Sequence, residues 1–181
     1  MRILETGLSG AVILEPQVHG DIRGFFSESY NRDVLDKAGL HYNFVQDNHS
    51  YSAEAGTLRG LHYQLLPKAQ TKLVRVLSGA IYDVFVDLRK DSATYGEWRS
   101  VILTAYNHRQ VLIPKGFAHG LYTLVPHTEV LYKVDEFYSK EHDRGILWND
   151  PQLNIPWPGS TVILSDKDKV HPLWADAEFD F

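Results

Sequence analysis

The chain has 181 residues, of which 44% are hydrophobic and 23% charged, a composition that predicts one globular domain over residues 1–181. A net charge of −5 provides no positive field for a phosphate polymer, which argues against nucleic acid as a partner. The sequence contains no cysteine and no hydrophobic run near the roughly 18 residues of a membrane span. We therefore expect a cytoplasmic protein without membrane contact, disulfides or cysteine-bound metals.

Most of the predicted elements are short β-strands. The first element is a helix over 31–38, which Asn31 caps and Gly39 ends. An extended segment follows at 58–64, and then come strands at 72–76, 80–88, 98–104, 110–113, 121–125 and 129–134. In 80–88 apolar residues alternate with Asp83 and Asp87, so we expect one buried face there. Short, closely spaced strands indicate an all-β sandwich or barrel with a few short peripheral helices.

The densest polar cluster is GTLRGLHYQ at 56–64. If 58–64 is extended, Gly60, His62 and Gln64 share one face with Leu58, which directs His62 toward a core or a barrel cavity. Taken alone, His62 is most simply explained as a core histidine hydrogen-bonded to a neighbour. A second polar cluster changes that interpretation.

The second cluster, IPKGFAHG at 113–120, places Pro114, Gly116 and His119 in a PxGxxH pattern. Together with the first cluster it resembles the two-part motif of the cupin superfamily, which implies a jelly roll, or double-stranded β-helix. Metal-binding cupins carry a second histidine and a glutamate where this chain has Gln64 and Lys72. An ammonium repels a divalent cation, so we expect no functional metal and a cationic cavity suited to an anion or an oxyanion.

These residues can support acid–base chemistry. A neutral His62 is a candidate general base, and Arg59 and Lys72 nearby are expected to lower its pKa. The SDKD segment offers Asp166 and Asp168 as the carboxylate that orients the imidazole, and the residues themselves do not decide between them.

The phenol of Tyr132 is a further candidate for acid–base chemistry. Tyr132 shares a strand face with Val130 and Val134, so an ordinary half-buried aromatic is the simpler interpretation of it, and Lys72 is equally explained as a charge at a strand edge. Base, phenol and ammonium together fit removal of a proton next to a carbonyl, stabilisation of the enolate, and protonation of the opposite face. The ketone is its own electron sink, and no dinucleotide or ATP motif is present, so we expect no cofactor.

The sequence resembles the dTDP-4-dehydrorhamnose 3,5-epimerase family over nearly its whole length. The matching stretches include DIRGFFSESYN, FVQDNHSYS, GTLRGLHYQ, AQTKLVRV, IPKGFAHG, ILWNDP and LSDKD. The resemblance implies inversion of C3 and C5 of dTDP-4-dehydro-6-deoxy-D-glucose, which gives dTDP-4-dehydro-L-rhamnose for dTDP-L-rhamnose biosynthesis. Both carbons are adjacent to the C4 ketone, in agreement with the chemistry above.

The resemblance also assigns roles to residues. It makes His62 the base paired with Asp168, Tyr132 the acid on the opposite sugar face, and Lys72 the cation near the C4 oxygen. The residues that it implies for substrate binding are Arg23, Glu28, Gln46, Asn48, Arg59, His119, Tyr138, Asp143 and Lys167. Tyr138 is expected to stack on thymine, and Asp143 stands where the family often has glutamate. Members are typically homodimers that exchange N-terminal strands, so Arg23 and Glu28 are expected to serve the partner's site.

Three alternatives remain open from the sequence. The chain could invert only C3 or only C5, or move the carbonyl between C3 and C4 as a ketoisomerase. A non-catalytic cupin that binds a nucleotide sugar is a second alternative. A metal-dependent oxygenase is a third, and Gln64 and Lys72 oppose it.

Overall fold

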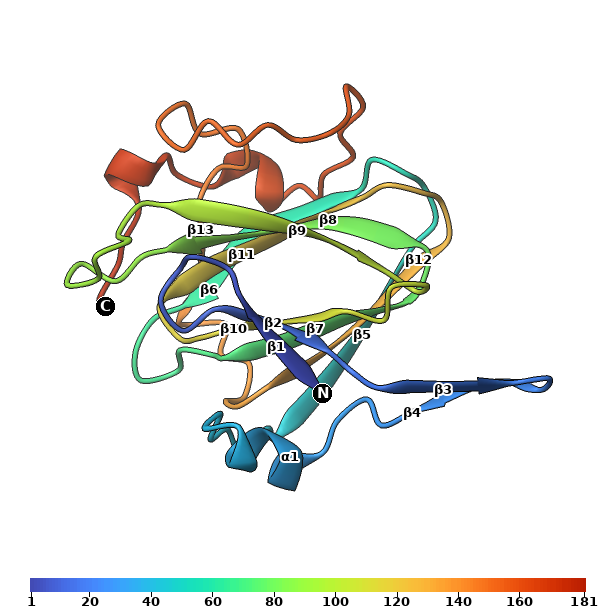
Figure 1. Cartoon of the computed structure of the whole chain (residues 1–181). Coiled ribbons are helices and arrows are strands. Elements are labelled where there is room, and N and C mark those ends of the chain that lie inside the picture. The colour runs from blue at the N-terminus through green and yellow to red at the C-terminus, as the bar shows by residue number, and fades with distance from the viewer.

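The computed structural model describes residues 1–181 and consists mainly of two antiparallel β-sheets that face each other (Figure 1). The larger sheet has the order β1-β2-β10-β7-β12-β5 and the smaller one β13-β6-β11-β8-β9. The strands of the larger sheet are β1 (Arg2–Glu5), β2 (Val12–Glu15), β10 (Gln110–Ile113), β7 (Lys72–Ser78), β12 (Thr128–Val134) and β5 (Gln46–Ser52). Those of the smaller sheet are β13 (Asp143–Gly145), β6 (Leu58–Gln64), β11 (Phe117–Thr123), β8 (Ala80–Asp87) and β9 (Trp98–Thr104). The expected all-β architecture is confirmed.

A separate hairpin, β3 (Val18–Asp21) with β4 (Gly24–Ser27), projects away from the two sheets (Figure 1). Its apolar side chains lack cover: Phe25 is 60% and Phe26 72% exposed. Neither strand was predicted, because the segment VHGD and the segment GFFS show no apolar–polar alternation.

The helices are short and peripheral, as predicted. In α1 (Arg32–Lys37) the Asn31 side chain accepts hydrogen bonds from the backbone N–H groups of Asp33 and Val34, and Gly39 follows the helix with a φ of +79°. Leu35 is the buried residue of this helix and packs against Leu14, Leu73 and Leu112 on the outside of the larger sheet. Two 3-10 turns, η1 (Asp168–Val170) and η2 (Trp174–Asp176), lie near the C-terminus. No helix is long and apolar enough to cross a membrane.

The interior between the sheets is an apolar cluster at one end and a polar cavity at the other. Val74 and Val130 of the larger sheet pack there against Ile81 and Phe85 of the smaller one. The opposite face of β8 is also buried, because the C-terminal segment lies over it and packs Leu153 and Trp174 against Val84 and Val86 (Figure 1). This covering segment also carries Asp168 to the cavity.

One prediction for β8 was therefore wrong. Asp83 and Asp87 were expected on a solvent face, whereas both are fully buried. Asp83 points into the interior beside His119, and Asp87 accepts hydrogen bonds from Arg89, Ser92 and Thr94. A strand covered on both faces does not show the alternation of a half-exposed strand in its exposure, although its sequence alternates.

A second difference concerns β11. The strand was expected to begin at Leu121, but it begins at Phe117 and is buried along its whole length. His119 consequently lies inside a central strand, paired with Phe85 on one side and His62 on the other.

Candidate active site

Most of the predicted site residues line one cavity between the two sheets. Its volume is about 400 Å³. The polar residues around it are Ser50, Thr57, Arg59, His62, Lys72, His119, Tyr132, Ser165, Lys167 and Asp168. An adjoining hollow of about 240 Å³ shares His62, Lys72, Tyr132 and Lys167 with the cavity and adds Tyr138 and Asp143. The two spaces adjoin at these four shared residues and together form one site lined by imidazole, phenol, ammonium and carboxylate groups.

An irregularity in the pairing of β6 with β11 places Arg59 and His62 on the same side of β6. His119 pairs with His62 and Leu121 with Arg59, so β6 has one more residue than β11 over this stretch. Such a bulge reverses the alternation, which lets Arg59 and His62 line the same cavity. The close approach of β6 to β11 at this bulge requires a glycine. A Cβ on Gly60, whose φ is +129°, would lie 2.6 Å from the Cα of Gly120. The predicted face of Gly60, His62, Gln64 and Leu58 did not include Arg59.

His62 and Asp168 form a hydrogen-bonded dyad. The imidazole Nε2 lies 2.5 Å from Asp168 Oδ1, and the carboxylate is buried. Burial lowers the pKa of His62, and Lys72 and Lys167 lower it further, against the opposing effect of Asp168. Arg59 was expected to lower the pKa of His62 together with Lys72, but Lys167 is the second cation that does so. Because the carboxylate accepts the proton on Nε2, Nδ1 carries the lone pair of a neutral base.

The pKa of Asp168 is lowered although burial acts in the opposite direction. The imidazoles of His171 and His62 and the Ser165 hydroxyl stabilise the carboxylate, and together they outweigh the cost of burying it. Asp168 therefore stays ionised and can stabilise the imidazolium that forms when His62 takes a proton. The structure also separates the two candidate carboxylates, because Asp166 is exposed and pairs with Lys169.

Lys72 is a buried cation at the first position of β7. Its Nζ lies 3.3 Å from the carbonyl oxygen of His62, to which it donates a hydrogen bond. Burial lowers its pKa to about 8, while Asp83 and Asp143 favour the charged form. The interpretation of Lys72 as an exposed strand-edge charge does not fit this environment, in which the residue is only 9% exposed.

His119 and Asp83 form a second, deeper pair, with His119 Nε2 2.8 Å from Asp83 Oδ2. The other carboxylate oxygen of Asp83 is buried and has no hydrogen-bond partner in the protein. Asp83 was not predicted as a site residue, because its regular place in the alternation of 80–88 indicated a solvent face.

Tyr132 reaches the cavity from the larger sheet. It lies on β12 opposite Val74 of β7, one strand away from Lys72. The ring packs against the interior apolar cluster, and burial raises the pKa of the phenol. Its hydroxyl makes no hydrogen bond within the protein, so it is available to a bound molecule.

The adjoining hollow carries a second set of polar groups. The Tyr138 hydroxyl donates a hydrogen bond to Asp143 Oδ2 at 3.0 Å, and Lys167 forms an ion pair with the same carboxylate. Gln46 and Asn48 of β5 line neither space, although Gln46 Nε2 donates to Asn48 Oδ1 at 2.8 Å and Gln46 Oε1 accepts a hydrogen bond from the Tyr138 N–H. The strand β5 was missed because its sequence, QDNHSYS, is polar on both faces.

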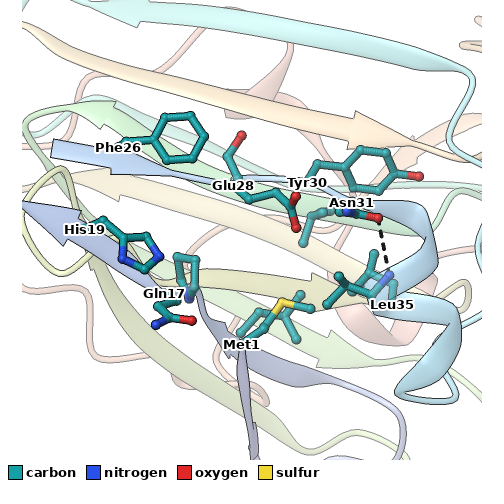
Figure 2. Close-up of a pocket in the computed structure, with 13 residues that line it drawn as sticks. Met1, Gln17, His19, Phe26, Glu28, Tyr30, Asn31 and Leu35 are labelled. Carbon is teal, nitrogen blue, oxygen red and sulfur yellow. Dashed lines mark hydrogen bonds between the residues drawn. The ribbon is translucent and has the colours of Figure 1, made fainter.

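Arg23 and Glu28 do not reach this cavity. Arg23 is exposed at the turn of the β3–β4 hairpin and pairs with Asp21. Glu28 lines a separate pocket of about 330 Å³, together with His19, Phe26 and Tyr30 (Figure 2). Both residues therefore lie outside the site of their own chain.

The site offers a possible metal cluster, but its geometry does not fit one. His62, Asp168 and His171 bring ligand-type atoms within 4.8 Å of one another. His62 Nε2 is already 2.5 Å from the Asp168 oxygen, whereas an ion must separate its ligands by binding each at about 2.0–2.2 Å. Lys72 and Lys167 add positive charge beside the cluster. Gln64 is occupied elsewhere: its amide donates to Lys68 and Phe137 carbonyls and accepts from Ser139 N–H.

His171 is a further residue that the sequence analysis missed. Its side chain is only 9% exposed and lies 3.4 Å from Asp168 Oδ1. The one available signal was its position three residues after Asp168 in a segment otherwise rich in charge, which is too weak to single it out.

Known proteins resemble this chain over almost its full length. A family model described as dTDP-4-dehydrorhamnose 3,5-epimerase matches residues 5–176. The dTDP-4-dehydrorhamnose 3,5-epimerase of Shigella flexneri is 51% identical over 180 residues, which cover 99% of each chain. These matches extend far beyond the motifs around His62 and His119.

Solved structures agree with that sequence similarity. The Bacillus anthracis dTDP-4-dehydrorhamnose 3,5-epimerase with TDP and PPi bound is 64% identical, with a TM-score of 0.93 over 95% of this chain and 98% of that one. The Legionella pneumophila dTDP-6-deoxy-D-glucose-3,5-epimerase in complex with dTDP-4-keto-L-rhamnose is 46% identical, with a TM-score of 0.91 over 95% and 92%. The predicted cupin jelly roll is confirmed by this agreement.

Proposed function

The chain belongs to the dTDP-4-dehydrorhamnose 3,5-epimerase family, and from this premise we propose how its site inverts two carbons of a dTDP-linked 4-keto sugar. The protein is an isomerase of dTDP-L-rhamnose biosynthesis that converts dTDP-4-dehydro-6-deoxy-D-glucose to dTDP-4-dehydro-L-rhamnose. We assign residues 1–181 to one epimerase domain. The observation that carries the mechanism is that His62, Lys72, Tyr132 and Asp168 surround one cavity.

The first step is removal of a proton next to the C4 ketone. His62 takes the proton from C3 or C5, and the electron pair of the broken C–H bond moves onto the C4 oxygen as an enolate. Asp168 stabilises the imidazolium that results, and the Lys72 ammonium stabilises the negative oxygen. No external electron acceptor is needed, because the ketone itself accepts the electron pair.

The second step returns a proton to the other face of the sugar. Tyr132 donates its hydroxyl proton to the carbon, the enolate returns to the ketone, and the configuration is inverted. Each inversion leaves His62 protonated and Tyr132 ionised, so both groups must exchange protons with solvent before the next inversion. Solvent hydrogen should therefore enter the product at both carbons.

The remaining polar residues are assigned to substrate binding. Arg59 has a planar fork for diphosphate oxygens, and its guanidinium is held by the Tyr51 carbonyl and the Ser52 hydroxyl. His119 is assigned to the sugar, and Tyr138, on a half-exposed wall of the adjoining hollow, to thymine. Four further residues are assigned to binding of the nucleotide: Lys167, Asp143, Gln46 and Asn48.

The hairpin supports an exchanged homodimer. Arg23 lies in the β3–β4 hairpin, which we call the arm, and Glu28 directly follows it. Both residues lie outside the cavity of their own chain, and the apolar side chains of the arm are exposed. We propose that this arm docks on a second copy, where both residues complete the partner's substrate site. The cysteine-free composition suits the cytoplasm, which we propose as its compartment.

The deciding experiment is hydrogen exchange in deuterium oxide. Metal-free protein incubated with dTDP-4-dehydro-6-deoxy-D-glucose should place deuterium at C3 and C5 of the product, as read by NMR. Tight binding of the nucleotide sugar without deuterium uptake would instead identify a non-catalytic binding module. Uptake at one carbon alone would identify a mono-epimerase.

A further inference from the structure

A second imidazole lies behind the His62–Asp168 dyad. His171 follows η1 directly, and its Nε2 lies 3.4 Å from Asp168 Oδ1, the oxygen that His62 contacts at 2.5 Å. The two imidazole rings meet edge to face, with centroids 5.4 Å apart and an interplanar angle of 72°. Two imidazoles thus converge on a single carboxylate oxygen.

The His171 ring is held in place by β13. Gly145, which pairs with His62 across the β6–β13 ladder, contacts the ring so closely that a Cβ there would lie 2.4–2.6 Å from three of its atoms. The ring also has little access to solvent. Packing against Gly145 therefore holds the ring beside the dyad.

The His171 Nε2 atom is buried and has no aligned hydrogen-bond partner in the protein. An unsatisfied buried ring nitrogen is costly, and such groups in native proteins often belong to functional sites. The acceptor within reach is Asp168 Oδ1, and catalytic hydrogen bonds are often long before substrate binds.

We propose that His171 is a positioning residue that donates its Nε2 proton to Asp168 and so limits how strongly this carboxylate attracts the proton of His62. A carboxylate oxygen shared by two N–H donors stabilises the imidazolium less than one held by His62 alone. His171 therefore helps His62 remain neutral, and hence basic, near neutral pH. This inference rests on the proposed role of His62 as the base.

Other charged groups act on the same dyad. Lys72 faces it from β7, Lys167 faces it from the turn before η1, and both favour neutral His62. Asp143 of β13 pairs with Lys167 and reduces the positive charge on this side. These groups stay unchanged when only His171 is replaced, so a shift in the titration of His62 reports on His171.

The test compares two replacements. His171→Phe keeps a ring in the pocket but removes the donor, and His171→Gln retains an N–H donor near the Nε2 position. The acidic limb of the pH profile of kcat/KM should move up by about one pH unit in His171→Phe and stay near the wild-type position in His171→Gln. His41→Phe is the matched control, because His41 also pairs with a carboxylate, Asp36, but is 72% exposed on the surface.

Two measurements distinguish this inference from the proposed function. If His171→Phe folds and its acidic limb stays in place, the role of His171 is overturned while His62 remains the base. If His62→Asn retains wild-type turnover, the proposed role of His62 as the base fails. Nitrogen-15 NMR of the wild-type protein provides a test that does not depend on folding of a variant: we expect neutral His171 to carry its proton on Nε2, and a proton on Nδ1 would overturn the inference.

Discussion

His62 and Tyr132 line the same cavity from opposite sheets, His62 from β6 of the smaller sheet and Tyr132 from β12 of the larger one. A sugar ring bound between the two sheets therefore presents one face to an imidazole and the other to a phenol. Inversion needs removal and delivery of a proton on opposite faces, and in the proposed mechanism these two side chains supply both.

Replacement of His62 tests the base. We expect His62→Ala to lower kcat/KM by about 100- to 10,000-fold, the usual contribution of a general base. The fold should persist, because the His62 side chain is 31% exposed and does not belong to an apolar cluster. Steady-state kinetics and thermal unfolding measure the two quantities. His49→Ala is the control, since His49 pairs with Glu129 on the exposed side of β5 and should retain full activity.

Replacement of Tyr132 separates exchange from inversion. Tyr132→Phe keeps the ring that packs in the interior but removes the proton donor. Deuterium should still exchange at the carbon, because His62 can remove and return a proton on its own face, while inverted product should fall at least tenfold. NMR of the sugar measures both rates. Equal loss of exchange and inversion would contradict the role of the hydroxyl, and Tyr106→Phe, at a 92% exposed residue, is the control.

The buried Lys72 ammonium should destabilise the folded protein while it supports catalysis. Its pKa is about 8 in the folded protein against 10.5 for an ordinary lysine, so the unfolded chain binds this proton more tightly. The contribution of Lys72 to the free energy of unfolding therefore rises as the pH increases from about 8 to 10.5. Below pH 8 the full cost of burying the ammonium is present. We expect Lys72→Met to raise the free energy of unfolding at pH 7 by up to about 3 kcal/mol and to reduce kcat by at least tenfold.

Urea unfolding at pH 7 and at pH 10 measures the stability effect, which should shrink at the higher pH. Lys37→Met serves as the control, because Lys37 is 75% exposed on α1 and its removal should change stability by less than about 0.5 kcal/mol. A Lys72→Met protein that is both active and no more stable than wild type would contradict this account.

Exchange of the N-terminal arm can be tested by complementation. A chain with His62→Ala has an inactive cavity and an intact arm, and a chain with Arg23→Ala and Glu28→Ala has the reverse. If the arm serves the partner, mixed dimers should contain one fully intact site and recover activity above that of either parent. If each arm serves its own chain, mixing should add nothing. Kinetics after mixing, with sedimentation to confirm the dimer, provides the measurement.

Several parts of the fold and site could be predicted from local sequence. The helix near Asn31 was predicted because capping and termination are local interactions, and strands such as 98–104 and 110–113 were predicted because their composition favours extended structure. Lys72 at the usual place of a metal-binding carboxylate predicted a cationic cavity, and the buried ammonium agrees with it. The polar strand β5 was missed, because it carries polar residues on both faces and has no hydrophobic face.

The sequence by itself determined the kinds of chemical group that are present: an imidazole, a phenol, an ammonium and carboxylates, with no thiol among them. Only the tertiary structure decided which of them meet. The residues alone left Asp166 and Asp168 open, and the C-terminal segment that folds back over β8 brings Asp168 to His62, as the family resemblance implied. Asp83 lies in the interior instead of on a solvent face for another reason, because the larger sheet covers the face of β8 that also carries Ile81 and Phe85. Burial and pairing between distant segments depend on what covers each face, and the local alternation of residues contains no information about that cover.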